Sequence, residues 1–514
     1  MKRTNTFFAM TALLLTGVSA TVSCSKDEEQ PAEGKTYHMT VTASKGGESA
    51  KALTVDGTTI SATWAAGEEV TVYNVTKGAA LTGTLAAQSS GASTTLEGTL
   101  TGTIEAGDEL TLKFCSPDYS MQDGTLEYIA ENCDYAEATV TVASVDGGEI
   151  AASGEAAFVN KQAIVKFSLM DAGGAAINAS VLSVTVGDVI YATIPASATN
   201  ELYVALPGIS GQAVTLSAKV GSQWYNKTQA NVTFVNGQYY TVAAKLAQKG
   251  MLPGTFSVSG SKKVHFSQGN LLYENGTWKF HANQYDYLGG TSHDVSESGS
   301  TDLFGWVGAS SNFTDVDQYG VTTSVQTNEV NGYGNVADEP LKADWGTLAI
   351  SNGGNTANSG WRTLTGSSDA EWQYLFDTRT ASTVGATANA RYAKAYLFGT
   401  THGVILFPDN YIHPTDVAAP TGINTTGNTS WDANTYTAED WAKMEAAGAV
   451  FLPAAGMRFD SSVYDVGTIG YYWSSSPDPS TVYYAYDVDF DSGRVLPANR
   501  STRSFGFSVR LVCE

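Results

Sequence analysis

Basic residues are scarce in this chain, and their scarcity argues against nucleic acid as a partner. The 514 residues include 28 Lys and Arg against 51 Asp and Glu, which gives a formal net charge of −23. Binding nucleic-acid phosphates requires a basic surface, and a chain of this composition does not provide one. The nucleic-acid-binding classes are therefore excluded.

Cysteine and charged residues of either sign are also few. Cysteines number 4, too few for a disulfide scaffold. Charged residues make up 15% of the chain, against roughly 25% in typical soluble domains. Hydrophobic residues make up 42%, which is enough to bury real cores and excludes a disordered chain. The length predicts two to four domains, and the 52 glycines favour a β-rich protein with many turns.

Long hydrophobic runs are absent beyond the first residues of the chain. Lys2 and Arg3 precede an apolar run over Phe7–Val18, which is too short for a stable transmembrane helix. A basic start, a short apolar run and small residues after it are typical of a secretory signal. Residues 1–23 are therefore predicted to be a signal peptide, and no other run approaches the length needed to span a membrane.

Two readings of this signal remain open. It is either simply removed, or it is a lipoprotein signal that is cut before Cys24, whose thiol is then lipidated. Ser23 fits the second reading, whereas Thr21 departs from the Leu usual at that place. Residues 24–36 then form a tether whose acidic start resembles the tag that sends some Gram-negative lipoproteins outward. The predicted location is the cell surface, with the outer membrane reached only through the lipid anchor.

Residues 37–247 alternate short apolar strands with turns of Gly, Asp, Asn and Ser. Strands spaced this closely, with no helical period, indicate β-sandwiches. The length fits two small ones, over 37–147 and 148–247. Cys115 and Cys133 both fall in the first, and in an exported protein they either pair or remain two thiols.

Two sequence segments in this half resemble segments of the fimbrillin family, the pilins of type V pili. They are Thr59–Tyr73, with its Trp, turn and strand, and the closing Phe234–Val242. The resemblance implies partners that are other pilin subunits, joined by strand exchange: a protease removes an N-terminal strand after a basic residue, and a neighbour's strand fills the groove. Lys51 is the candidate processing position, and a solvated surface lysine is the alternative.

After a linker at 248–255, the composition and pattern of the sequence change. Trp and Tyr become dense over 256–514, and two helix starts appear. Ser368 with Glu371 suggests a capping box for a helix over 370–379, and Thr437 with Asp440 suggests another for 439–447. Strand-like runs surround them, so this part is predicted to be α+β. The predicted fold class is a multidomain chain, all-β at first and α+β at its end.

The C-terminal part resembles the C-type-lectin-like fold, in particular the branch of the formylglycine-generating enzymes. The motifs that carry this resemblance occur in the expected order, at 263–271, 284–289, 302–306, 360–364, 371–372, 451–456, 471–475 and 506–512. The resemblance implies a fold and says little about function. We expect most of its Trp and Tyr residues to pack in the core.

No catalytic constellation is recognisable, so an enzyme is not predicted. The formylglycine-generating enzymes need a pair of reactive cysteines, and this part has only Cys513. The six histidines are scattered, and neither a zinc-binding helix motif nor a nucleophile elbow is present. Asp487, Asp489 and Asp491 alternate along one strand face, where a solvated surface is favoured over a catalytic pair, and calcium binding is the further alternative. No cofactor or metal is predicted.

The last forty residues favour a binding surface. Residues 474–510 contain no Lys, Glu, Gln, Met or Trp, the five residues that adenine mutagenesis of an AAC codon cannot produce. This resembles the C-type-lectin-like proteins that are diversified by retroelements; an ordinary sheet end with one fixed ligand is the alternative. The predicted ligand-binding positions are Asp478, Ser480, Val482, Tyr483, Tyr484, Asp487, Asp489, Asp491, Arg494, Leu496, Asn499, Arg500, Ser501, Thr502, Ser504 and Phe505.

Together these features predict a surface lipoprotein that acts as an adhesin at the tip of a type V pilus. Tyr, Arg, Ser and Asn in the last segment form a composition typical of paratopes. The expected ligand is a protein or glycan on a host, bacterial or phage surface. The alternative function is a glycan-binding surface protein of fixed specificity that serves nutrient capture.

Overall fold

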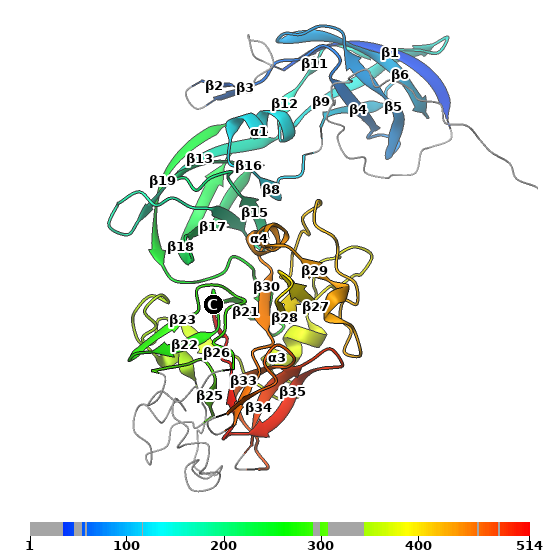
Figure 1. The fold of residues 1–514 in the computed structure, drawn as a ribbon. Helices are drawn as coiled ribbons and strands as arrows, with labels where there is room; N and C mark the ends of the chain where they lie inside the picture. Colours follow the sequence, from blue (N-terminus) through cyan, green and yellow to red (C-terminus); the bar gives the residue numbers. More distant parts are fainter. Residues whose placement is uncertain are drawn as a thin grey trace, which may run out of the picture.

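The computed structural model describes residues 34–45, 54–56, 59–115, 117–290, 299–306, 344–459, 462–481 and 484–514. Strands make up 51% of it and helices 7%, so the chain is mostly β, as predicted. Figure 1 shows three bodies in chain order, from the blue strands at one end to the orange and red strands at the other. Cys24, Lys51, Val482 and Tyr483 lie outside the described residues.

The first body is a closed β-barrel, in which the strands form a ring. Its sheet runs in the order β10-β1-β6-β5-β4-β7-β9-β12, and β10 also pairs with β9, which closes the ring. Alternate residues of each strand face the inside, where Met39, Leu96 and Leu110 are fully buried. The strands are β1 (Lys35–Ser44), β4 (Glu69–Asn74), β5 (Ala79–Ala87), β6 (Ser93–Gly102), β7 (Glu109–Phe114), β9 (Ala136–Asp146), β10 (Glu149–Ser153), β11 (Ala156–Ala157) and β12 (Val159–Asn160), with a separate hairpin of β2 (Thr54–Asp56) and β3 (Thr59–Ser61).

This ring differs from the predicted sandwich of two sheets. A sandwich and a barrel have the same alternation of buried and exposed residues, so the sequence pattern does not distinguish them. Closure depends on β10, whose register against β9 shifts between Ala151 and Ala152 while its other edge pairs with β1. Such an irregularity bends a strand and increases its twist, which favours closure.

The second body has two layers. Its strands run in the order β16-β13-β19-β18-β17-β14-β15-β8, and β18 and β19 meet only at Tyr225–Gln248 and Asn226–Ala247. The layers enclose a core that includes Phe167, Leu182 and Leu216. The strands are β8 (Met121–Gln122), β13 (Gln162–Asp171), β14 (Val181–Val186), β15 (Val189–Thr193), β16 (Glu201–Pro207), β17 (Ile209–Val220), β18 (Gln223–Phe234) and β19 (Tyr239–Gln248).

A segment of the first body packs on the second. Between β7 and β9 the chain crosses over, and β8 pairs with β15. The Gln122 side chain donates to the Ala205 carbonyl and accepts from the Ala205 amide, both at 2.8 Å. The next helix, α1 (Leu126–Asn132), begins at Thr125 and buries Ile129 against the second body. Cys133, which follows α1, is a buried free thiol, so the disulfide left open by the sequence is not formed here.

The C-terminal part consists of small sheets joined by loops. Within its described residues the sheets are β20-β21-β37-β26, β23-β22-β24, β25-β36-β31-β32, β29-β27-β28-β30 and β33-β34-β35. Their bounds are β20 (Phe256–Ser257), β21 (Lys263–Phe266), β22 (Leu271–Glu274), β23 (Thr277–Phe280), β24 (Ser300–Thr301), β25 (Phe304–Gly305), β26 (Trp361–Thr363), β27 (Tyr392–Leu397), β28 (Thr401–Leu406), β29 (Thr435–Tyr436), β30 (Val450–Pro453), β31 (Met457–Phe459), β32 (Ser462–Tyr464), β33 (Gly470–Pro477), β34 (Tyr484–Phe490), β35 (Val495–Thr502), β36 (Gly506–Phe507) and β37 (Leu511–Cys513).

One of the two predicted capping boxes is formed. Helix α4 (Ala438–Ala446) starts at Thr437, whose hydroxyl accepts from the Asp440 amide while the Asp440 carboxylate accepts from the Thr437 amide. Three-residue 3-10 turns occur at η3 (Trp345–Thr347) and η5 (Trp431–Ala433).

The capping box predicted at Ser368 is wrong. Helix α3 (Glu371–Gln373) starts at Ala370 without a side-chain cap and continues as the π-helical turn η4 (Tyr374–Thr378). Glu371 turns instead toward Arg362 and Thr365, from which it accepts hydrogen bonds. The charged guanidinium therefore takes the carboxylate that a cap would need.

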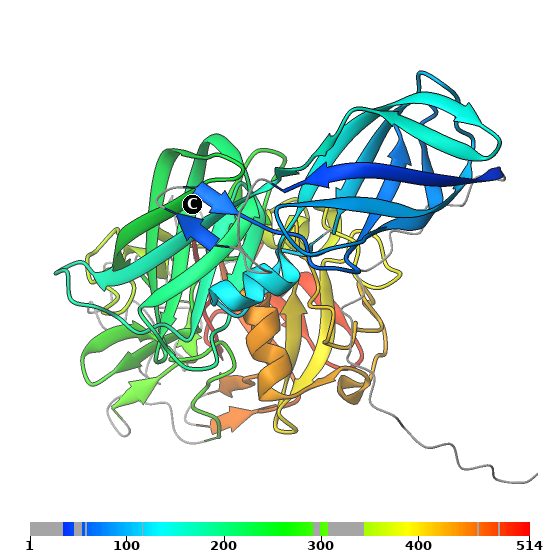
Figure 2. The ribbon, with the colours of Figure 1, turned by 90° about the horizontal axis from the view of Figure 1, so that it is seen from above.

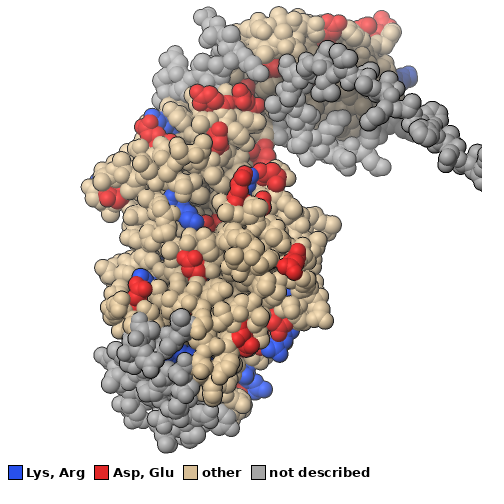
Figure 3. All heavy atoms as spheres, viewed as in Figure 1, with Lys and Arg blue, Asp and Glu red and all other residues tan. Residues whose placement is uncertain are grey.

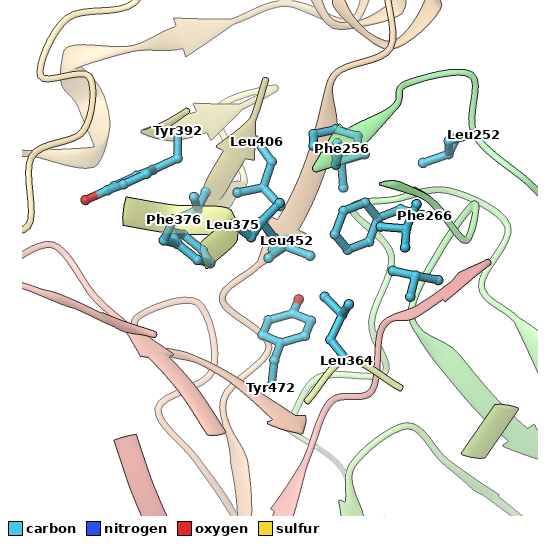
Figure 4. Close-up of a cluster of buried hydrophobic side chains, with 14 of the residues drawn as sticks. Leu252, Phe256, Phe266, Leu364, Leu375, Phe376, Tyr392, Leu406, Leu452 and Tyr472 are labelled. Carbon is cyan, nitrogen blue, oxygen red and sulfur yellow. The ribbon is translucent and has the colours of Figure 1, made fainter. Parts of the chain in front are cut away.

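The second body and the C-terminal part share one hydrophobic core. Val181, Ile190 and Trp224 of the second body join the buried cluster of the C-terminal part; Figure 4 shows side chains of that cluster converging from several elements. Lys219 Nζ lies 2.6 Å from Glu445 Oε2, and the Ser183 hydroxyl donates to the Ala446 carbonyl at 2.8 Å. Viewed from above in Figure 2, the first body extends to one side of these two.

Candidate functional site

The predicted ligand-binding positions gather on the three-stranded sheet β33-β34-β35 and its turns. This sheet lies at the end of the molecule opposite the first body (Figure 1). Ser480, Arg494, Leu496 and Arg500 are exposed, and Tyr484, Asp491, Asn499, Ser501, Thr502 and Phe505 are half-buried. Asp478, Asp487, Asp489 and Ser504 are buried. The structure brings the predicted positions together on one sheet and its turns, but the sequence does not separate the exposed positions from the buried ones.

The strand register distributes these positions over both sides of the sheet. Tyr484 lies opposite Thr502, and Tyr486 lies opposite Arg500, on one side. Asp487 lies opposite Asn499, and Ala485 opposite Ser501, on the other side. Strand β35 is the edge of this sheet, so side chains of both sides approach solvent along it. We call the set Arg494, Leu496, Asn499, Arg500, Ser501 and Thr502 the β35 surface.

A buried carboxylate holds the head of Arg500. The Arg500 Nη1 atom donates to Asp478 Oδ2 at 3.0 Å; the arginine side chain is 52% exposed and that of Asp478 only 1%. The other Asp478 oxygen accepts from the amide and the hydroxyl of Ser480 at 2.8 and 2.7 Å. Burial opposes ionisation, but the Ser480 hydrogen bonds and the Arg500 charge together lower the pKa of Asp478. The guanidinium is therefore held in place while much of it faces solvent.

Arg494 is held in the same way at the β34–β35 turn. Its Nη2 atom donates to Asp489 Oδ2 at 2.7 Å, and its Nε lies 3.3 Å from Asp491 Oδ2. The Asp491 carboxylate also accepts from the Arg494 amide, which fixes the turn. Figure 3 shows acidic and basic side chains next to one another in this region. Both arginines of the β35 surface are thus positioned before any ligand binds.

The expectation of a solvated carboxylate face is wrong for Asp487 and Asp489. Burial raises the pKa of Asp487 to about 8, although Asn499 donates to it at 3.3 Å. Burial also raises the pKa of Asp489 to about 6, against the opposing charge of Arg494. Strand alternation puts both on one side but does not reveal that neighbouring elements cover that side. Among the described residues, no group of acidic, His or Cys side chains is arranged to hold a metal ion.

Two exposed aromatic residues near this sheet were missed by sequence reasoning. Phe459 of β31 is 43% exposed, and its ring meets that of Phe505 edge to face at 5.5 Å. Tyr464 of the adjacent β32 is 47% exposed. Exposed aromatic rings are common anchors in interfaces. The sequence signal that could have found them is the presence of two aromatic residues within one short hairpin.

Cys513, the cysteine considered for catalysis, is buried within a sheet. Burial raises the pKa of the Cys513 thiol to about 11, so this thiol is protonated at neutral pH. Its strand β37 is paired on both edges, with β21 and β26. One cleft, of about 300 Å³, is lined by Asp188, Lys263 and Asp409 among others, and none of its lining residues belongs to the β35 surface. Within the described parts of the chain, no helix is long and apolar enough to cross a membrane.

Comparison with known proteins gives limited matches. A family model described as a domain of unknown function, DUF8237, matches residues 426–512, which include the β35 surface and cover well under half of the chain. No curated protein sequence matches. Several solved structures that resemble this chain are described as fimbrial or cell-adhesion proteins.

Three of these structures illustrate the range. The tip fimbrial protein Mfa3 of Porphyromonas gingivalis, truncated at its C-terminus, is 10% identical and has a TM-score of 0.23, over 41% of this chain and 95% of its own. A fimbrial assembly protein of Parabacteroides distasonis is 9% identical at 0.22, over 46% and 96%. A fimbrial protein of Bacteroides ovatus is 10% identical at 0.20, over 94% and 100%. At these scores the likeness establishes neither a shared fold nor a shared function.

Proposed function

We propose that this chain is a cell-surface lipoprotein that acts as an adhesin of a type V pilus. Its C-terminal part, a lectin-like domain in this proposal, binds a protein or glycan on another surface by non-covalent recognition. The β35 surface makes the contacts. The first body joins the chain to other pilin subunits, and Cys24 anchors it to the outer membrane before assembly.

The observation that carries this proposal is the way the two arginines of the β35 surface are held. Each is exposed on an edge strand or its turn while a buried aspartate fixes its guanidinium. Leu496 adds an exposed apolar side chain, and Asn499, Ser501 and Thr502 add adaptable hydrogen-bonding groups. Fixed cations beside adaptable polar groups suit recognition, because little side-chain freedom is lost on binding.

Diversification of residues 474–510 by a retroelement is part of this proposal. The buried positions Asp478 and Asp489 would then vary together with the exposed ones, and their replacement would change how the arginines are held. DNA beside the gene should contain a near-copy of the last coding segment that differs at adenines, close to a reverse transcriptase. An identical gene end in many cells of one culture, with no such copy, would leave a binding protein of fixed specificity.

Strand exchange is proposed for the first body, and the position of β1 supports it. Strand β1 pairs with β6 along its whole length and with β10 and β11 on its other edge. Lys51, the candidate processing position, follows it in the sequence. Loss of β1 would leave a groove with free hydrogen-bonding edges on both sides, which an extended strand of another subunit can fill.

A ligand screen on the full chain tests the adhesin proposal. Glycan arrays, protein arrays and whole cells would be probed with the wild type and with the triple variant Arg494→Ala, Leu496→Asp and Arg500→Ala. Val235→Asp is a matched control, because Val235 is 54% exposed on the second body. We expect the triple variant to lose binding and the control to retain it. Equal binding by all three proteins would mean that the ligand site lies elsewhere.

A further inference from the structure

Strand β1 is followed by a lysine whose ammonium group is buried among aromatic rings and carboxylates. The side chain of Lys45 is 1% exposed. Its Nζ lies 3.2 Å from the centre of the Phe114 ring and 4.1 Å from that of Trp64. It also lies 3.1 Å from Glu68 Oε2 and 3.7 Å from Asp134 Oδ2. We call Trp64, Glu68, Phe114 and Asp134 the lysine cage.

The lysine cage requires a cation. Burial raises the pKa of Asp134, and the nearby Lys45 ammonium is the main influence that opposes this rise. The Glu68 side chain is 16% exposed and that of Asp134 is 13% exposed, so water shields neither fully. The faces of Trp64 and Phe114 attract the same ammonium through their ring quadrupoles. An uncharged side chain in this place would leave two carboxylates without a counter-charge.

The lysine cage is the end of a longer groove that holds β1. Tyr37, Met39, Val41 and Ala43 face the core of the first body, and Lys45 continues this alternation. The backbone hydrogen bonds to the neighbouring segment of the same chain also continue, because the Lys45 amide donates to the Ala92 carbonyl at 2.9 Å. The inward side chains become smaller from Tyr37 to Ala43, and the series ends with the cation. The inward face of this segment therefore has side chains of decreasing size, followed by one positive charge.

We propose that the lysine cage selects the strand that this body accepts from another subunit. The accepted strand carries alternating inward residues that decrease in size, followed two positions later by a lysine that enters the cage. This inference rests on the strand exchange proposed above, and it adds the chemistry of the partner. A strand of similar shape without the lysine is rejected, because it would bury Glu68 and Asp134 with no cation between them.

The test uses the full chain with a specific protease site inserted between Glu48 and Ser49. Cleavage leaves β1 held without a covalent link, and a labelled peptide of residues 35–45 is then added in excess. Incorporation of the label is measured for the wild-type peptide, for Lys45→Met and for Lys35→Met. The last is the matched control, because Lys35 is exposed and its replacement changes the peptide charge equally.

We expect the wild-type and Lys35→Met peptides to exchange alike, and the Lys45→Met peptide to bind more weakly by a factor of at least roughly 100. Equal exchange of all three peptides would overturn the selection by the lysine cage and leave strand exchange intact. If no peptide exchanges, under conditions in which the cleaved β1 itself dissociates, strand exchange fails and the inference fails with it.

A variant of the groove separates charge recognition from shape. In the cleaved chain carrying Glu68→Gln and Asp134→Asn, the cage no longer presents carboxylates. The preference for the wild-type peptide over Lys45→Met should then fall to less than roughly threefold, since only the ring contacts still favour the ammonium. An undiminished preference would show that the fit of the lysine side chain, and not its charge, decides which strand is accepted.

Discussion

The lysine cage and the β35 surface both pair a cation with buried carboxylates, yet the two cations differ in exposure. The side chain of Lys45 is 1% exposed, whereas that of Arg500 is 52% exposed over an Asp478 that is almost fully covered. In the cage the ammonium group and the carboxylates are all shielded from water, so each charge depends on its partners for stabilisation. At the β35 surface only the carboxylate has left water, and the arginine keeps part of its hydration.

This difference separates two uses of the same chemistry. Inside the first body the cation holds a strand in place, because removing it leaves buried charges unpaired. On β35 the buried carboxylate holds the cation in place and leaves the outer side of the guanidinium exposed to solvent. Substitutions should therefore affect stability most at Lys45 and binding most at Arg500.

Replacement of Lys45 should produce the largest change in stability. The Lys45→Met variant fills the space but not the charge, and we expect it to destabilise the first body by about 3–5 kcal/mol. Hydrogen exchange at the β1 and β6 amides measures this locally, which avoids assuming that the whole chain unfolds in one step. Lys35→Met, at an exposed position, should change stability by less than about 0.5 kcal/mol. Similar values for the two variants would contradict the dependence on burial.

The buried aspartates beneath β35 should give the next largest effect, and it should depend on pH. The pKa of Asp487 is about 8 and that of Asp489 about 6, both raised by burial. Protons are therefore held more tightly in the folded chain, and stability should decrease as pH rises from about 4, the unfolded value, toward 8. Asp487→Asn removes one of these protonations and should stabilise the C-terminal part by on the order of 2 kcal/mol at pH 8, with little effect at pH 4.

Melting temperatures of the two proteins from pH 4 to pH 9 measure this effect. Asp491→Asn is the control, because Asp491 lies in the same region but is only half-buried. A constant difference between Asp487→Asn and the wild type at every pH would mean that burial does not govern this carboxyl group.

Arg500→Ala should change stability little and binding strongly. The pair it breaks is exposed on one side, and Asp478 keeps both hydrogen bonds from Ser480, so we expect a loss of less than about 1 kcal/mol. Ligand affinity, measured with whichever surface or glycan the screen identifies, should fall at least about tenfold. A variant that unfolds readily but still binds would reverse the roles assigned to the two regions.

His38 should produce the smallest effect. Its ring lies 3.0 Å from Glu149 and 3.2 Å from Glu97, and these partners, Glu149 first, raise its pKa. Its contribution is therefore complete below about pH 6.5, the unfolded value, and is lost as pH rises through the folded pKa. Amide exchange of β1, corrected for intrinsic rates, should be slightly faster at pH 8 than at pH 6 in the wild type. His38→Gln should remove that difference.

What the sequence predicts well in this chain is local. The capping box at Thr437 is formed because both its partners lie within one turn, whereas Glu371 is taken by Arg362 from a separate strand. The strand Tyr484–Phe490 is found where alternation predicts it. Local pattern specifies an element, and contacts between elements decide its final partners.

What the sequence does not predict depends on which elements cover which. Alternation places Asp487 and Asp489 on one side of a strand, but only the packed chain reveals that this side is buried. Ring closure of the first body depends on both edges of β10. Lys45 reads as an ordinary lysine at a strand end, because Trp64, Phe114 and Asp134 approach it from distant parts of the sequence.

The central claim is that the β35 surface binds the ligand while the lysine cage holds a strand, and one paired measurement tests it most directly. Adhesion to the identified surface and hydrogen exchange of β1 would both be measured for the wild type, Arg494→Ala with Arg500→Ala, and Lys45→Met. The account predicts that the arginine variant loses adhesion with β1 exchange unchanged, and that Lys45→Met speeds β1 exchange with adhesion by the C-terminal part retained. Retained adhesion in the arginine variant, or unchanged β1 exchange in Lys45→Met, would contradict it.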